Sequence, residues 1–255
     1  MINTQTFCLV NETALKQKRT IKIKDHFSYC KNRDKAKGGV GTVIPNYLKP
    51  HTTKVAEGKE GDEYLITRLD HVVPALNIVN IYGEQESRTG KDQILSSWLK
   101  LTKDLEEIED RKEAVLIFGD LNRAIGSDEW GISGNHDRVL YGGELVRDML
   151  KNKDYVLLKG GPWTWVQRGK EWIRSCLDLA IGSANLVPFV KQILIDKNRK
   201  FTPRRVIRRK GKIHFSFLSG DTAEGHAKKC ETESGETCCM EYRQTWWMDE
   251  VQRSY

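Results

Sequence analysis

The chain has 255 residues, of which 38% are hydrophobic and 30% are charged, and its formal net charge is +7. This length suits one substantial core, and the composition is that of a soluble protein with a packed interior. No stretch approaches the roughly 18 apolar residues that a membrane span requires. The first residues show no secretory signal pattern, so we expect an intracellular protein that does not contact a membrane.

Apolar runs rich in β-branched and aromatic residues predict strands, and apolar residues at three- and four-residue spacings predict helices. One helix is predicted over Asp92–Ile108, with Leu99 among its inward-facing residues, and a second over Gly143–Asn152. Many strands with few helices favour a layered α/β sandwich with two sheets in the middle. The predicted strands are Thr6–Val10, Gly39–Ile44, Tyr64–Leu69, Leu76–Tyr82, Ala114–Phe118, Tyr155–Leu158, Leu177–Ile181 and His214–Leu218.

Two of these strands end at polar residues that are candidates for a site. Glu12 comes just after the first strand, and Tyr82 is the last residue of the strand Leu76–Tyr82. Loops at the ends of strands commonly hold active-site residues. Taken alone, a glutamate such as Glu12 is more often a surface or capping acid, and a tyrosine such as Tyr82 more often simply packs at a strand end.

The segment from Val115 to Asn122 is more specific. Its buried strand ends in Gly119-Asp120-Leu121-Asn122, which places a carboxylate and a carboxamide two residues apart on the same side of the chain. Such a pair can hold a hard cation or an attacking water while the amide donates to a phosphate oxygen. The alternative is an Asx turn that closes the strand.

A second acid lies within the apolar run Ser175 to Ile181, where Asp178 is flanked by leucines. An unpaired carboxylate inside a buried strand is costly. We therefore expect Asp178 to have a partner such as an imidazole, a metal ion or a set of amides.

The last third of the chain divides into a basic block and an acidic tail. Lys197–Lys212 contains nine Lys or Arg residues and no acid, and residues 219–255 contain eight acids against four bases. A basic block gains affinity for DNA or RNA through counterion release, although a solvated loop has the same composition. We predict one domain over residues 1–218 and a partly disordered, divergent tail over 219–255.

Five motifs, in this order and at these distances, carry a resemblance to a known family. They are FCLVNETALK, VNIYGE, LIFGDLNRAIG, GGPWTWVQRG and SCLDLAI. Together they resemble the endonuclease/exonuclease/phosphatase superfamily, and within it the endonuclease domain of non-LTR retrotransposons. The resemblance implies an α/β four-layer sandwich of two mixed β-sheets flanked by helices. It also implies a Mg²⁺-dependent nuclease, with Mn²⁺ as a substitute, that acts on DNA in the nucleus beside a reverse transcriptase of the parent element.

The same resemblance assigns roles to individual residues. Glu12 corresponds to the metal ligand, Tyr82 to the tyrosine on the scissile phosphate, Asp120 to the residue that orients or deprotonates the attacking water, and Asn122 to a residue that positions water and phosphate. Asp178 would orient a catalytic histidine, for which His214 is the candidate. The substrate-binding candidates are Thr164, Trp165 and Ser175 from the motifs, and Arg204, Arg205, Arg208 and Arg209 from the basic block.

Two departures from the family pattern bear on activity. The superfamily opens with an Asn-bearing strand about thirty residues before the glutamate, whereas Glu12 lies near the start of this chain, so the first strand is expected to be missing and a sheet edge exposed. In the adjacent Asp-His motif, His214 is present but Ile213 occupies the aspartate position.

Three functional hypotheses remain open at this point. The first is a Mg²⁺-dependent phosphodiesterase that nicks DNA, with activity impaired by the two departures. The second is a catalytically dead nucleic-acid-binding remnant. The third is a phosphatase that acts on a small phosphate ester or a phosphoinositide, because the basic block suits either polyanion.

Overall fold

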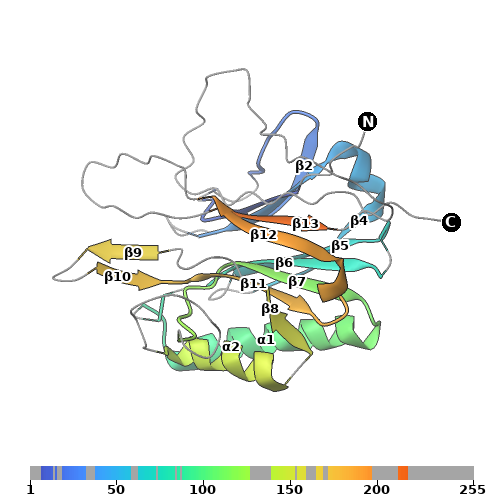
Figure 1. Cartoon of the computed structure of the whole chain (residues 1–255). Helices are drawn as coiled ribbons and strands as arrows, with labels where there is room; N and C mark the ends of the chain where they lie inside the picture. Colours follow the sequence, from blue (N-terminus) through green and yellow to red (C-terminus); the bar gives the residue numbers. More distant parts are fainter. Residues whose placement is uncertain are drawn as a thin grey trace.

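The computed structural model describes residues 7–13, 15, 19–32, 38–58, 63–72, 74–83, 85–86, 88–126, 139–152, 154–158, 165–168, 172–196 and 212–217. Its centre is a mixed six-stranded sheet that lies face to face with a smaller antiparallel sheet (Figure 1). In spatial order, the large sheet consists of β4 (Thr52–Glu57), β5 (Glu63–Leu69), β6 (Leu76–Tyr82), β7 (Ala114–Asp120), β11 (Asp178–Ser183) and β8 (Tyr155–Leu157). The small sheet consists of β1 (Cys8–Asn11), β3 (Val40–Pro45) and β2 (His26–Lys31).

The parallel pair of the large sheet is β6 and β7, and their connection explains the first helix. A parallel pair needs a crossover, which α1 (Lys91–Asp110) supplies. Together with α2 (Tyr141–Asn152), α1 covers the outer face of the large sheet (Figure 1). No described helix is long and apolar enough to cross a membrane.

One residue of the predicted helix stripe was placed wrongly. Leu99 is 58% exposed, whereas Leu101 is buried. The buried stripe runs through Ile94, Trp98, Leu101 and Leu105, so Leu99 falls one position past it and turns toward solvent. The second helix meets the prediction, since Val146, Met149 and Leu150 are buried among the inward-facing residues.

Apolar side chains fill the space between the two sheets, and a coil segment covers the far side of the small sheet. The side chain of Ile21 lies against Gly41 there, in a cluster with Val10 and Val43. In the described residues, the outer layer on this side is therefore chain without regular secondary structure rather than an α-helix. The core between the sheets includes Phe7, Leu9, Ile44, Ile78, Leu116 and Phe118.

The predicted α/β sandwich of two sheets is confirmed, with the described α-helices on the outer face of the large sheet. All eight predicted strands are present; Leu76–Tyr82 has the predicted ends, and the other seven have shifted ends. Two further strands, β2 and β4, complete the sheets, and three more form separate hairpins. Within the described part, β1 is hydrogen-bonded to β3 alone and is an edge strand of the small sheet. The hairpins are β9 (Trp165–Arg168) with β10 (Trp172–Ser175), and β12 (Val190–Asp196) with β13 (Lys212–Phe217); the short 3₁₀ helices are η1 (Asn46–His51) and η2 (Val187–Phe189).

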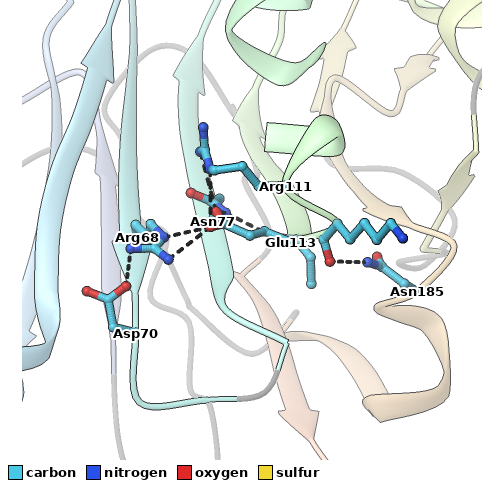
Figure 2. Close-up of polar contacts among 8 residues, drawn as sticks. Arg68, Asp70, Asn77, Arg111, Glu113 and Asn185 are labelled. Atoms are coloured by element: carbon cyan, nitrogen blue, oxygen red, sulfur yellow. Dashed lines mark hydrogen bonds and ion pairs between the residues drawn. The ribbon is translucent and has the colours of Figure 1, made fainter. Parts of the chain in front are cut away.

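A polar cluster closes the end of the large sheet where β6 and β7 begin (Figure 2). The carboxylate of Glu113 accepts hydrogen bonds from Asn77 Nδ2 at 2.8 Å, from Arg68 Nε at 3.1 Å and from Arg111 Nε at 3.1 Å. Burial alone would raise the pKa of Glu113, but these donors outweigh it, so the pKa is lowered. The cluster keeps a buried carboxylate ionised and tied to three elements.

Candidate active site

The opposite end of the large sheet carries the predicted site residues in one row. Tyr82 on β6 is paired with Asp120 on β7, and Asp120 is paired with Asp178 on β11. Residues paired in this way lie on neighbouring strands about 4.8 Å apart and point to the same face of the sheet. Asp120 is 4% exposed and Asp178 is 2% exposed. The register thus gathers a phenol and two carboxylates at one edge of the sandwich.

Glu12 reaches this row from the other sheet. It follows β1 and has a left-handed backbone with φ of 52°, and its carboxylate Oε1 accepts a hydrogen bond from the hydroxyl of Tyr82 at 2.6 Å. Burial of the phenol and the adjacent Glu12 carboxylate raise the pKa of Tyr82, so Tyr82 remains a neutral donor. The contact connects β6 with β1 across the two sheets.

The turn after β7 has a geometry that requires its glycine. Gly119 has φ of 150°, and a Cβ there would overlap the carbonyl oxygen of Ile81 on the neighbouring strand. Asn122 has φ of 50°; its backbone N–H donates to Asp120 Oδ1 at 3.2 Å, and its Nδ2 donates to the carbonyl of Gly83 at 2.7 Å. The Asx turn that the sequence left as an alternative is present, and it forms part of the site's framework.

Backbone strain in the described residues concentrates here. Four described non-glycine residues have positive φ, namely Glu12, Asp25, Lys112 and Asn122. Two of the four are predicted site residues. Conformations of this kind cost of order 1–3 kcal/mol each and persist where the surrounding structure over-determines them, commonly at functional sites.

Several polar residues at this end were not predicted from sequence. Glu63 pairs with Tyr82 from the other side, is 2% exposed and accepts a hydrogen bond from the backbone N–H of Gly39. Asn80 donates across the sheets, and Arg123 is buried against Gly142 at the start of α2. The sequence signal for these residues was a polar residue inside or directly after an apolar run. Many residues with a purely structural role show the same pattern, so it does not identify a site.

The structure describes the other predicted site residues in part or not at all. Trp165 pairs with Ser175 in the β9–β10 hairpin, and His214 pairs with Leu194 in the β12–β13 hairpin. For these residues the backbone position is known, and the predicted approach of His214 to Asp178 remains a prediction. Outside the described residues lie Thr164, Arg204, Arg205, Arg208, Arg209 and the tail 219–255.

Comparison with known proteins places the fold. No family model matches the chain, and no curated protein matches its sequence. A 3′ phosphatase, NExo from Neisseria, solved with a product DNA hairpin, matches with a TM-score of 0.56 and 15% identity over 80% of this chain and 86% of that one. An AP endonuclease from Archaeoglobus fulgidus matches with a TM-score of 0.53 and 10% identity over 77% and 83%.

A third match concerns the predicted subgroup. The endonuclease domain of TRAS1, a telomere-specific non-LTR retrotransposon, matches with a TM-score of 0.49 and 14% identity over 69% of this chain and 75% of that one. At these identities the matches establish the fold, and the similarity to TRAS1 is too low to add to the argument. The chain therefore has the same α/β sandwich fold as these solved structures.

Proposed function

We propose that this protein is a metal-dependent phosphodiesterase that nicks DNA. The observation that carries the proposal is the convergence of Tyr82, Asp120 and Asp178 in one row of the large sheet, with Glu12 joined to Tyr82 from the small sheet. Two carboxylates beside a neutral phenol can accept a proton from water and donate to a phosphate oxygen. Hydrolysis of a phosphodiester by acid–base catalysis needs both a proton acceptor for the water and a donor to the phosphate.

Asp120 is the group we assign to the attacking water. As a carboxylate it takes the proton of a water that attacks phosphorus in line, while the bond from phosphorus to a 3′ oxygen breaks and that oxygen takes a proton from solvent. Asn122 holds the turn against Gly83 and keeps the Asp120 carboxylate oriented through its backbone N–H. The hydroxyl of Tyr82 donates to Glu12 in the structure, and its single proton would turn to a phosphate oxygen when substrate is bound.

Mg²⁺ fits the donor set through Glu12. Among the described residues, no group of three or more His, Cys, Asp or Glu side chains could hold a metal ion. Mg²⁺ commonly takes one or two carboxylates together with water and substrate phosphates, so Glu12 and a bound phosphodiester suffice as ligands. When bound, the ion would neutralise charge that develops on the phosphate. Mn²⁺ would fit the same oxygen ligands.

Plasmid nicking tests the proposal, with one carboxylate at each end of the sheet as a matched pair. The wild type should convert supercoiled plasmid to the open circle in Mg²⁺, and EDTA should stop it. Asp120→Asn should lower kcat by about 10²–10⁴-fold, the contribution of a general base. Glu113→Gln, the same chemical change at the opposite end, should leave kcat unaltered. A pure wild-type protein that leaves plasmid intact at high concentration would refute the proposal.

A second candidate is a DNA-binding domain without turnover, which the replacement of the motif's aspartate by Ile213 favours. It predicts salt-sensitive DNA binding that does not depend on Mg²⁺, carried by the basic block. Neutralising Arg204, Arg205, Arg208 and Arg209 together should then abolish binding. Unchanged affinity would exclude this candidate, and turnover of a phosphoinositide or a small phosphate ester without DNA nicking would select the phosphatase hypothesis.

The biological setting is proposed from the motif resemblance. A retrotransposon endonuclease acts on chromosomal DNA, so we propose a nuclear location and a reverse transcriptase encoded by the same element. Sequencing the coding region around this chain tests the second point, because the parent element would encode a reverse transcriptase next to it. A coding context without one would remove the support for this setting.

A further inference from the structure

The two sheets are connected by a buried amide that lies directly behind the candidate active site. Asn80 on β6 is fully buried, and its Nδ2 donates to the carbonyl of Gly41 on β3 at 2.9 Å and to the carbonyl of Val10 on β1 at 3.4 Å. Val10 and Gly41 are themselves paired between β1 and β3. One side chain of the large sheet therefore contacts both β1, which leads directly into Glu12, and β3, which is paired with β1.

The contact from Asn80 to Val10 and the contact from Tyr82 to Glu12 join the same two segments of the fold, two residues apart. On β6, Tyr82 follows Asn80 by two residues and points to the same face of the sheet. After β1, Glu12 follows Val10 by two residues, and Tyr82 OH lies 2.6 Å from Glu12 Oε1. The Asn80 amide thus fixes the distance between β6 and β1 two residues before Tyr82 and Glu12 come into contact.

The Asn80 side chain contributes more to the relative position of the two sheets than to the stability of the fold. Its Oδ1 is buried, and no described group donates a hydrogen bond to it. A half-satisfied buried amide contributes less stability than an apolar side chain of the same size often would, because the unpaired oxygen has lost its hydration. Nothing in core packing favours Asn at this position, since the residues around it between the sheets are predominantly apolar.

We propose that Asn80 is a positioning residue that holds Glu12 against Tyr82 across the two sheets, and so sets the reach of both groups to the phosphodiester. The inference rests on the proposed function, because its consequence for turnover requires a nuclease. A misplacement of about 1 Å in a catalytic group can cost 10²-fold in rate. Asn80 touches neither substrate nor water in this account and acts through Tyr82 and Glu12.

Asn77 provides a matched control on the same strand. It is also a fully buried asparagine of β6 that donates to another element, but it lies on the opposite face and at the opposite end, where it contacts Glu113. Asn80→Leu should lower kcat about 10–100-fold with KM for DNA nearly unchanged, whereas Asn77→Leu should lower the unfolding temperature and spare kcat. Retention of kcat in Asn80→Leu, with an active wild type, would overturn the inference.

A double-mutant cycle separates positioning from general damage. If Asn80 acts through the Tyr82–Glu12 contact, then Asn80→Leu combined with Tyr82→Phe should lower kcat no further than Tyr82→Phe alone. Independent, multiplying effects would overturn the inference. Should Asn80→Leu fail to fold, Asn80→Ala removes the same donor without adding bulk and enters the same cycle.

A measurement without turnover keeps this inference distinct from the nuclease proposal. Tyrosine labelled with ¹³C at Cζ gives a resonance for Tyr82, which Tyr82→Phe identifies by its loss. Asn80→Leu should move this resonance toward that of free tyrosine, and Asn77→Leu should leave it in place. An unmoved resonance in Asn80→Leu would refute the positioning role, whether or not the wild type cuts DNA.

Discussion

The two ends of the large sheet surround their carboxylates with different groups. At the end where β6 and β7 begin, Glu113 is surrounded by Asn77 and two arginines, and its pKa is lowered. At the other end, Asp120 is paired with Asp178, and Glu12 accepts from a neutral phenol. The arginines at the first end stabilise the charge of a buried carboxylate in the folded state, whereas the neighbouring carboxylates at the second end are the groups that the proposed chemistry would use.

Backbone geometry follows the same division. The candidate site has Glu12 and Asn122 in left-handed conformations and a glycine that no other residue can replace without overlap. At the opposite end, Lys112 has a left-handed backbone, but it lies just after α1, where such a conformation commonly ends a helix. The left-handed residues at one end belong to the candidate site, and Lys112 at the other end belongs to a chain reversal, and substitutions can tell the two cases apart.

The largest expected effect on folding comes from Gly119→Ala. The new Cβ would overlap the carbonyl of Ile81 on the paired strand, and backbone cannot yield as a flexible side chain can. We expect the free energy of unfolding, measured with urea, to fall by about 3 kcal/mol or more. Gly90→Ala is the control, because a Cβ at Gly90 meets nothing within 4 Å. Equal stability of both variants would show that the turn is not constrained by its neighbour.

Tyr82→Phe should separate chemistry from stability. The hydroxyl is the donor to Glu12, a partly exposed carboxylate that water can solvate once the donor is removed. We expect kcat for nicking to fall about 10–100-fold while the free energy of unfolding changes by about 1 kcal/mol or less.

Tyr155→Phe is the matched control for this change, since Tyr155 is another buried tyrosine of the same sheet, on the edge strand β8. It should leave kcat unchanged. A Tyr82→Phe protein with full activity would remove the phenol from the proposed site.

The sequence predicted the residues of local motifs better than the residues whose position depends on how the two sheets pack. Asp120 was predictable because an apolar run that ends in Gly-Asp-x-Asn fixes both strand and turn locally. Glu63 and Asn80 were not, because their roles depend on how two sheets pack and on partners far along the chain. Strand β2 was missed for a related reason: its residues are half-buried and form no apolar run.

The position of Glu12 at the candidate site was predictable only through the order and spacing of the five motifs. Its hydrogen bond to Tyr82 joins residues 70 positions apart, so no local pattern encodes it. The Glu113 cluster left no recognisable motif either, because Arg68, Asn77 and Arg111 come from separate elements that meet only after the sheet has formed.

Glu113→Gln tests the stabilising end and has a defined pH dependence. Loss of the charged acceptor should lower the free energy of unfolding by about 2 kcal/mol at neutral pH, the range of hydrogen bonds to charged groups. Because the folded-state pKa is lowered, this contribution is fully present above the ordinary value of 4.5 and is lost as the pH falls through the folded value. Urea unfolding of both proteins from pH 7 to pH 3 should show the difference shrink. A constant difference would mean that the charge of Glu113 does not matter.

The smallest expected effect is a gain. Lys112 has φ of 56°, and glycine adopts this region without the clash of a Cβ, so Lys112→Gly should raise the free energy of unfolding by about 0.5–1 kcal/mol and leave nicking unchanged. Asn122→Gly relieves the same strain at φ of 50° but loses the hydrogen bond from Nδ2 to Gly83. Urea unfolding and kcat, measured together, should therefore show Lys112→Gly stabilised and fully active, and Asn122→Gly stable but slow. If Asn122→Gly kept its kcat, the left-handed turn after Asp120 would be a feature of folding alone, like the one at Lys112.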